Sequence, residues 1–196
     1  EEECVFTLTH AGYIKRQPAD TYQAQRRGGR GITALSHKED DFVEELFLAS
    51  SHDHILFVTD FGRVYRLKGY QIYEGSRTSR GVNIVNLLPL AEGETVTSML
   101  RVPEGAEGYL VMVTKRGIIK RTELSQFANI RKSGLIAINL NEGDRLAWTR
   151  ITSGSDELIV ATRLGVAIRF PETDVRTMGR TATGVRAIRL AEGDEV

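Results

Sequence analysis

The chain has 196 residues with 26 basic and 26 acidic side chains, so its formal net charge is zero, and 41% of its residues are hydrophobic. This length predicts one domain or two small ones, and the neutral balance argues at face value against a binder of nucleic acids or membrane surfaces. No apolar stretch approaches the roughly 18 residues of a membrane span. A single cysteine, Cys4, excludes a disulfide framework and a structural zinc site and fits a reducing cytosol. Because the sequence begins with three glutamates, we expect it to be part of a longer chain.

Hairpins are predicted at four places along the chain, each with the same pattern. An apolar run is followed by Thr-x-x-Gly, and an arginine stands four residues after the glycine. Thr-x-x-Gly suits a tight turn whose last residue has a positive φ, and the short flanking runs are rich in strand-forming residues. The four predicted hairpins are residues 5–16, 55–66, 110–121 and 158–169.

A second glycine follows the first glycine of each unit after 17 or 19 residues, at Gly31, Gly81, Gly134 and Gly184. The apolar run after it predicts a third strand, and a run before the hairpin, such as residues 46–49 or 147–151, predicts a fourth. Four strands in about 50 residues are the content of one propeller blade. The predicted fold class is therefore all-β and propeller-like, a single domain over residues 1–196 with about four four-stranded blades. The approximate repeat units are 1–45, 46–96, 97–146 and 147–196.

The charges sort by their position within each unit. The four windows between the first and second glycines carry 17 basic and 5 acidic residues, a net of +12, and the rest of the chain carries −12. Equivalent positions in a stack of repeats lie at equivalent places, so the windows predict a basic band that suits a long polyanion such as DNA. The fourth window contributes only +1, so we expect the band to weaken there.

The four repeated arginines, Arg16, Arg66, Arg121 and Arg169, admit two interpretations. Counting by twos along the strand places Arg16 on the same apolar face as Ile14. A structural role, with the aliphatic stem packed and the head paired with an acid, is favoured slightly over a phosphate contact.

One basic loop, Gln25-Arg26-Arg27-Gly28-Gly29-Arg30-Gly31, occurs only once. Glycine lets backbone N–H groups approach phosphate closely, and arginine offers paired donors that match it. In the first of several units of about 50 residues, this loop resembles the gyrase-A box, and the whole chain resembles the C-terminal DNA-wrapping domain of the bacterial DNA gyrase A protein. That family usually has six blades, so either the sequence stops early or this member is short.

The resemblance implies a β-pinwheel, whose blades exchange strands, with duplex DNA wrapped around its basic perimeter. It implies a non-catalytic, cytoplasmic, nucleoid-associated domain of an ATP-dependent type IIA topoisomerase, with the rest of the gyrase A protein and the gyrase B protein as partners in an A2B2 enzyme. It implies no membrane partner and no cofactor in this domain, since ATP and Mg are used elsewhere in the enzyme. The residues expected to bind DNA are Gln25, Arg26, Arg27, Gly28, Gly29, Arg30, Gly31, Arg77, Arg80, Arg131, Lys132 and Arg180.

Three alternatives compete with this hypothesis. One is the related C-terminal domain of topoisomerase IV, which generally lacks an intact box. Another is a protein-interaction propeller, although the kelch double glycine and the Trp-Asp pair are missing. The third is a metal or catalytic site: His52 and His54 alternate in a turn without a third ligand, and no phosphate-binding loop or activated nucleophile is present. No catalytic residue and no metal site are therefore expected.

Overall fold

The computed structural model describes residues 1–20 and 41–196, and strands dominate these ranges. The strands are β1 (Glu3–Thr9), β2 (Tyr13–Pro18), β3 (Val43–Ser50), β4 (His54–Thr59), β5 (Arg63–Lys68), β6 (Val82–Asn83), β7 (Val96–Val102), β8 (Tyr109–Thr114), β9 (Ile118–Glu123), β10 (Leu135–Ile136), β11 (Leu146–Thr152), β12 (Glu157–Ala161), β13 (Ala167–Pro171) and β14 (Val185–Arg186). Four short 3-10 helices follow or interrupt them, namely η1 (Gly69–Gln71), η2 (Ile84–Asn86), η3 (Leu124–Phe127) and η4 (Glu172–Asp174).

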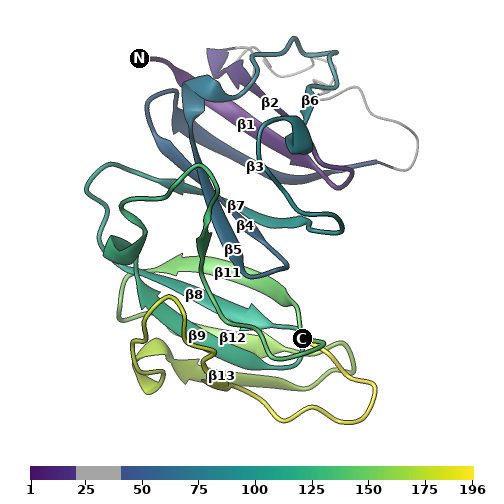
Figure 1. The fold of residues 1–196 in the computed structure, drawn as a ribbon, viewed down its shortest axis with the longest axis vertical. Helices are drawn as coiled ribbons and strands as arrows, with labels where there is room; N and C mark the ends of the chain where they lie inside the picture. Colours follow the sequence, from purple (N-terminus) through teal and green to yellow (C-terminus); the bar gives the residue numbers. More distant parts are fainter. Residues whose placement is uncertain (21–40) are drawn as a thin grey trace, which may run out of the picture. The chain divides into compact units, whose positions relative to one another are not determined.

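The strands form repeated sheets (Figure 1), with the orders β3-β1-β2-β6, β10-β5-β4-β7 and β11-β8-β9-β14. A fourth sheet contains β12 and β13 within the described residues. The prediction of an all-β chain built from repeated sheets is confirmed; the first three predicted hairpins form the centres of four-stranded sheets, and the fourth hairpin forms the two-stranded sheet.

Each four-stranded sheet is completed by residues from the following repeat. The short strand after the second glycine pairs with the hairpin of the preceding repeat, so that Val82 lies opposite Ile14. The same exchange places Leu135 opposite Val64 and Val185 opposite Ile119. The third strand predicted in the second, third and fourth repeats therefore exists, but it belongs to the sheet of the previous repeat; the one predicted in the first repeat lies outside the described residues.

The prediction for the fourth strand needs a correction. The run at residues 46–49 does not join the hairpin that follows it, because β3 pairs with β1 and Phe47 lies opposite Phe6. In the same way β11 pairs with β8, where Ile151 lies opposite Leu110. Either neighbouring hairpin offers a free edge to such a strand, so its position in the sequence alone does not determine its partner.

By its contacts the chain divides into two compact units, and the boundary passes through β4, β5 and β7. The first unit holds Glu1–Leu56, Arg66–Glu92 and Arg101–Glu104, and the second holds Phe57–Tyr65, Gly93–Leu100 and Gly105–Val196. In the first unit the ring of Phe6 is fully buried and stacks on that of Phe47 at a centroid distance of 5.7 Å. In the second unit a buried apolar cluster joins the third and fourth sheets and comprises Val111, Val113, Ile119, Val160, Val175 and Ile188.

The Thr-x-x-Gly turns form as predicted. At the first hairpin the N–H of Gly12 donates to the carbonyl of Thr9 at 2.9 Å, and Gly12 has a φ of 92°. The Thr9 hydroxyl oxygen accepts from the N–H of Tyr13 at 3.1 Å, so Thr9 closes the turn with both its backbone carbonyl and its side chain. The other three turns repeat both bonds.

Acidic residues near the end of each repeat hold these turns in place. Asp41 Oδ1 accepts from the N–H groups of Ala11 and Phe42 at 2.9 and 3.0 Å. Burial alone would raise the pKa of Asp41, but these hydrogen bonds outweigh it and lower the pKa. Asp144 and Asp194 accept the equivalent pairs of bonds at the third and fourth hairpins. These carboxylates are therefore structural parts of the turns.

The favoured structural role of the repeated arginines, with a packed stem and a paired head, is confirmed at Arg121 and Arg16. Arg121 donates to the carbonyl of Val175 at 3.0 Å and pairs with the fully buried Glu172 at 3.3 Å. Arg16 makes the equivalent contacts: it donates to the carbonyl of Ile72 at 2.8 Å and pairs with Glu74 at 3.5 Å. Arg169 pairs with Glu157 in an exposed ion pair.

The close approach behind the exchanged strand predicts a specific glycine requirement at Gly184. An added Cβ there would lie 2.4 Å from the carbonyl oxygen of Ile119, whereas at Gly165 it would meet nothing within 4 Å, and φ is 104° and 91° respectively. Gly165→Ala should lose about 1–2 kcal/mol from its positive φ alone, and Gly184→Ala should lose about 3 kcal/mol or more. Urea unfolding followed by fluorescence of Trp148, the single tryptophan, measures both variants. Equal losses would contradict the proposed close approach.

The buried Arg121–Glu172 pair predicts a pH dependence of stability. Burial alone would raise the pKa of Glu172, but hydrogen bonds from Thr152, Asp156, Gly154 and Arg121 hold it below its ordinary value of 4.5. This stabilisation is complete above pH 4.5 and is lost as the pH falls through the folded-state pKa. Glu172→Gln should lose about 3 kcal/mol at neutral pH, since it leaves a buried guanidinium uncompensated, and should flatten the acid limb.

The matched control for that pair is Glu157→Gln. Its partner Arg169 is 71% exposed and Glu157 is 51% exposed, so the loss should stay below about 1 kcal/mol. Urea unfolding between pH 3 and 7 compares the two variants. An acid limb as steep in Glu172→Gln as in the unchanged chain would contradict the assignment.

Candidate nucleic-acid interface

The residues predicted to bind DNA fall into two groups. Gln25, Arg26, Arg27, Gly28, Gly29, Arg30 and Gly31 lie outside the residues that the structure describes. The remaining five, Arg77, Arg80, Arg131, Lys132 and Arg180, stand on segments that precede the second glycine of their repeats. These segments run beside the hairpin of the preceding repeat, because the following strand pairs with that hairpin.

The two predicted cations of the second repeat, Arg77 and Arg80, differ in their surroundings. Arg77 is exposed. Arg80 is half-buried, and its guanidinium carbon stacks over the ring of Tyr13 at 3.6 Å from the centroid. The Nε of Arg80 is buried and lacks a hydrogen-bond partner among the described residues. Arg77 is therefore free to reach a ligand, whereas Arg80 is held by the hairpin.

Beneath this loop lies a lysine whose side chain is fully buried. Lys15 Nζ donates to the carbonyls of Ser76, Arg77 and Ser79 at 2.8, 3.2 and 2.9 Å. Burial lowers the pKa of Lys15 to about 8. Three carbonyl acceptors use all three N–H donors of an ammonium group, so the contact is made by the charged form.

Lys120 of the third repeat has the same arrangement and is also fully buried. Its Nζ donates to the carbonyls of Ala137, Arg180 and Ala182 at 2.6, 2.5 and 3.3 Å. Burial, with a smaller contribution from the charge of Arg180, lowers the pKa of Lys120 to about 8. Arg180 is half-buried, and its guanidinium lies 3.5 Å from the carbonyl of Ile136.

The other predicted pair, Arg131 and Lys132, is exposed. Its loop is held differently, since the guanidinium of Arg63 donates to the carbonyl of Ser133 at 2.9 Å. The next residue, Gly134, lies over Tyr65, where an added Cβ would come within 2.7 Å of the ring. Each described basic loop is thus fixed at its backbone. Arg77, Arg131 and Lys132 stay exposed, whereas Arg80 and Arg180 are half-buried.

The charge windows missed three arginines that the fold brings together. Arg116, Arg186 and Arg189 line a shallow hollow of about 460 Å³ with Ile188, Leu190 and Asp194. All three are exposed, and the ion pairs found within residues 1–20 and 41–196 involve none of them. Asp194 is engaged by the N–H groups of Leu164 and Glu195. The hollow therefore carries an excess of positive charge.

These arginines change the expectation for the fourth repeat. The window ending at Gly184 counted only +1 and predicted a weaker band. Arg186 and Arg189 lie just beyond that glycine, and Arg116 lies one residue before the third window begins. A search for cations flanking each glycine would have found them, but their convergence depends on the pairing of Arg186 with Ile118.

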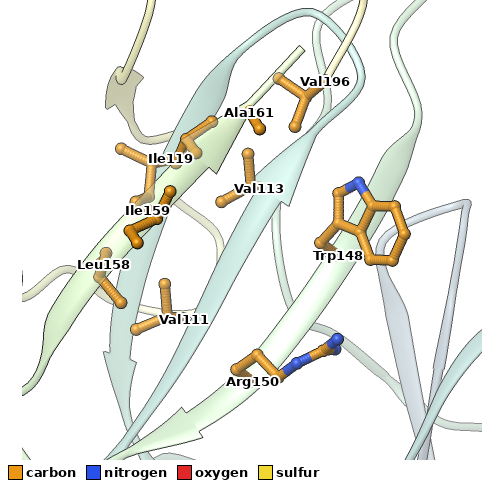
Figure 2. A pocket seen from close by; sticks show the side chains of 10 residues that line it. Val111, Val113, Ile119, Trp148, Arg150, Leu158, Ile159, Ala161 and Val196 are labelled. Atoms are coloured by element: carbon orange, nitrogen blue, oxygen red, sulfur yellow. The ribbon is translucent and has the colours of Figure 1, made fainter. Parts of the chain in front are cut away.

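A second hollow, of about 310 Å³, is apolar and lies among β8, β11 and β12 (Figure 2). Leu158, Ile159 and Ala161 face Val111 and Val113 across it, and Trp148 and Arg150 stand along its edge. With one arginine as its only charged lining residue, it lacks the convergent polar groups that orient a small-molecule substrate.

Two other kinds of feature are missing from the described ranges. There, no group of three or more His, Cys, Asp or Glu side chains is arranged to hold a metal ion. Within the same ranges no helix has the length and apolar character to span a membrane.

Comparison with known proteins identifies the repeats. The family model for the DNA gyrase C-terminal domain, β-propeller, matches four times, at residues 5–50, 53–103, 108–153 and 156–196. Each of the first three matches contains one hairpin and the edge strand that follows it in the same sheet. These edge strands are β3, β7 and β11.

The curated relatives are longer proteins. The DNA gyrase A protein of Clostridium acetobutylicum is 56% identical over 95% of this chain, and that of Staphylococcus aureus is 48% identical over 100%. The chain spans 22% of the length of each of these relatives.

Two solved structures share the fold at 28% sequence identity. A C-terminal domain of DNA topoisomerase IV has a TM-score of 0.84 over 99% of this chain and 59% of its own. A DNA gyrase A C-terminal domain has a TM-score of 0.75 over 99% of this chain and 63% of its own. The topoisomerase IV domain is thus a structural relative, whereas the family model and the curated relatives name gyrase. The chain belongs to the family of DNA gyrase C-terminal, β-propeller domains.

Proposed function

We propose that this chain is a non-catalytic domain that binds and wraps duplex DNA for a type IIA topoisomerase. The observation that carries the proposal is the set of exposed cations on backbone-anchored loops at equivalent places in the repeats. Arg77, Arg131 and Lys132 are exposed, and none takes part in an ion pair found within the described ranges. Cations in such positions suit the phosphates of a long polyanion.

The contacts are to phosphate, so the binding reads little sequence directly. A duplex that follows successive loops has to bend, and the energy of bending depends on the DNA sequence. We therefore expect a preference for flexible sequences. The arginines around the hollow, Arg116, Arg186 and Arg189, extend the proposed surface in the second unit.

The role in the whole enzyme is proposed from the family. The wrap presents a neighbouring DNA segment to the cleavage core of an A2B2 gyrase, and strand passage driven by ATP yields negative supercoils. ATP and Mg act in other parts of that enzyme, so this domain needs no cofactor. Its proposed location is the bacterial cytoplasm, at the nucleoid.

The first test is the salt dependence of DNA binding. If about five to eight phosphates are neutralised, the slope of log K against log salt should lie near −5 to −7, at roughly −0.9 for each contact. Arg131→Ala with Lys132→Ala should make the slope shallower by about 2. Filter binding with duplex DNA measures both.

The control for that pair is Arg101→Ala, which removes a cation already paired with Asp53 at 2.8 Å. It should leave the slope unchanged. A flat salt dependence in the unchanged chain would refute the proposed function.

The second test concerns the loop at residues 25–31. Replacing Arg26, Arg27 and Arg30 with alanine should reduce wrapping more than binding, because cations on the other repeats still hold the DNA. Wrapping is measured as the change in linking number captured when a relaxed plasmid is closed by ligase in the presence of the protein. Undiminished capture by the triple variant would remove the special role of this loop.

A further inference from the structure

The third residue after the hairpin glycine differs in chemistry between the repeats. It is Lys15, Tyr65, Lys120 and Ile168 in turn. Each precedes the repeated arginine by one residue, so it points to the other face of the same strand. A lysine at this position is surprising, because lysine is almost never fully buried unless it is paired. Lys15 and Lys120 are both fully buried.

The partners of these two lysines are backbone carbonyls and not carboxylates. All three partners of Lys15 and two of the three partners of Lys120 belong to the loop that carries the predicted DNA-binding cations of the following repeat, whereas the third partner of Lys120 is the carbonyl of Ala137 in its own repeat. Lys15 donates hydrogen bonds to the carbonyl of Arg77 itself and to those of Ser76 and Ser79. Lys120 takes the carbonyl of Arg180 itself and that of Ala182.

These bonds control which parts of the loop face outward. Three carbonyl dipoles of residues 76–79 point inward to one ammonium group, so their negative ends are withdrawn from the surface a phosphate would approach. The side chain of Arg77 is left exposed on the other side.

Stability of the fold alone is a weak explanation for a buried cation. Removing an ammonium group from water is costly, and its hydrogen bonds to the carbonyls must first offset that cost. Tyr65 fills the equivalent position, and its hydroxyl donates a hydrogen bond to Glu94 at 3.2 Å. A strand of this fold therefore accommodates a side chain other than lysine here.

We propose that Lys15 and Lys120 are positioning residues that hold the basic loops at residues 76–80 and 180–182 in the conformation that contacts DNA phosphates. The inference rests on the proposed function. It assigns to the lysines an action through Arg77, Arg80 and Arg180 rather than a contact with DNA.

The experiment compares Lys15→Met and Lys120→Met with Tyr65→Phe in the full 196-residue chain. Methionine keeps an unbranched apolar stem and removes the donors. Tyr65→Phe is the matched control, because it removes a buried hydrogen bond to Glu94 at the same position of the repeat and keeps the ring that packs against Gly134. Filter binding to one DNA duplex gives the salt slope, urea unfolding gives stability, and amide hydrogen exchange reports on residues 77–80.

Lys15→Met should lose stability, because three loop carbonyls lose their donor, speed amide exchange in the loop, and make the salt slope shallower by about 1 to 2. Lys120→Met should make it shallower by about 1, through Arg180. Tyr65→Phe should lose stability and keep the slope. In a chain that already carries Arg77→Ala and Arg80→Ala, Lys15→Met should cause no further change in slope, because the residues it positions are gone.

The outcomes separate this inference from the proposed function. If Lys15→Met and Lys120→Met keep the salt slope of the unchanged chain although amide exchange in the loop is faster, the positioning role is overturned while DNA binding stands. An additive loss in the Arg77→Ala, Arg80→Ala background would overturn it as well. If Lys15→Met fails to fold, Lys120→Met decides by the same criteria. A flat salt dependence in the unchanged chain would overturn both proposals.

Discussion

The structure depends on one constraint: the segment after the second glycine of a repeat must pass close against the hairpin of the repeat before it. Gly81 lies where an added Cβ would be 2.3 Å from the carbonyl oxygen of Ile14, and Gly184 stands in the same relation to Ile119 at 2.4 Å. Their φ values are 92° and 104°. This approach lets the exchanged strand complete the preceding sheet, and it brings the loop before the glycine within reach of Lys15 or Lys120. A single repeat makes only part of its own sheet, so neighbouring repeats fold as a coupled series.

Hydrogen bonding within the fold decides which charges this chain of zero net charge leaves at its surface. Many of its carboxylates are used inside the fold, since Asp41, Asp144 and Asp194 accept backbone N–H groups at the hairpin turns. The excess of +12 in the four windows is also smaller at the surface than it is in the sequence. Lys15, Arg16, Lys120 and Arg121 lie within those windows and are used to join repeats. The cations that remain for the proposed DNA surface are therefore the exposed ones.

The sequence predicted the local structure well, because local structure is set by residues close together in the chain. The threonine and glycine of each turn are three residues apart, and their hydrogen bonds need no other part of the molecule. Which sheet β3 belongs to was not predictable, because an antiparallel strand between two hairpins has two possible partners. The hollow formed by Arg116, Arg186 and Arg189 was missed for a related reason, since it depends on the exchange of β14 into another sheet. The role of Lys15 was hidden because a lysine in a basic window suggests a surface charge.

A consequence for binding follows from where the basic loops are anchored. The side chains proposed to contact DNA belong to one repeat, whereas the groups that fix their backbone belong to the repeat before it. These groups are Lys15 for Arg77, Arg63 for the loop of Lys132, and Lys120 for Arg180. DNA bound to a loop favours the conformation in which these anchors are made, so by linkage it also stabilises the preceding hairpin. A duplex spanning several loops would then reinforce the pairing between successive repeats. The affinity of each loop and the integrity of the repeat series are two aspects of the same set of interactions.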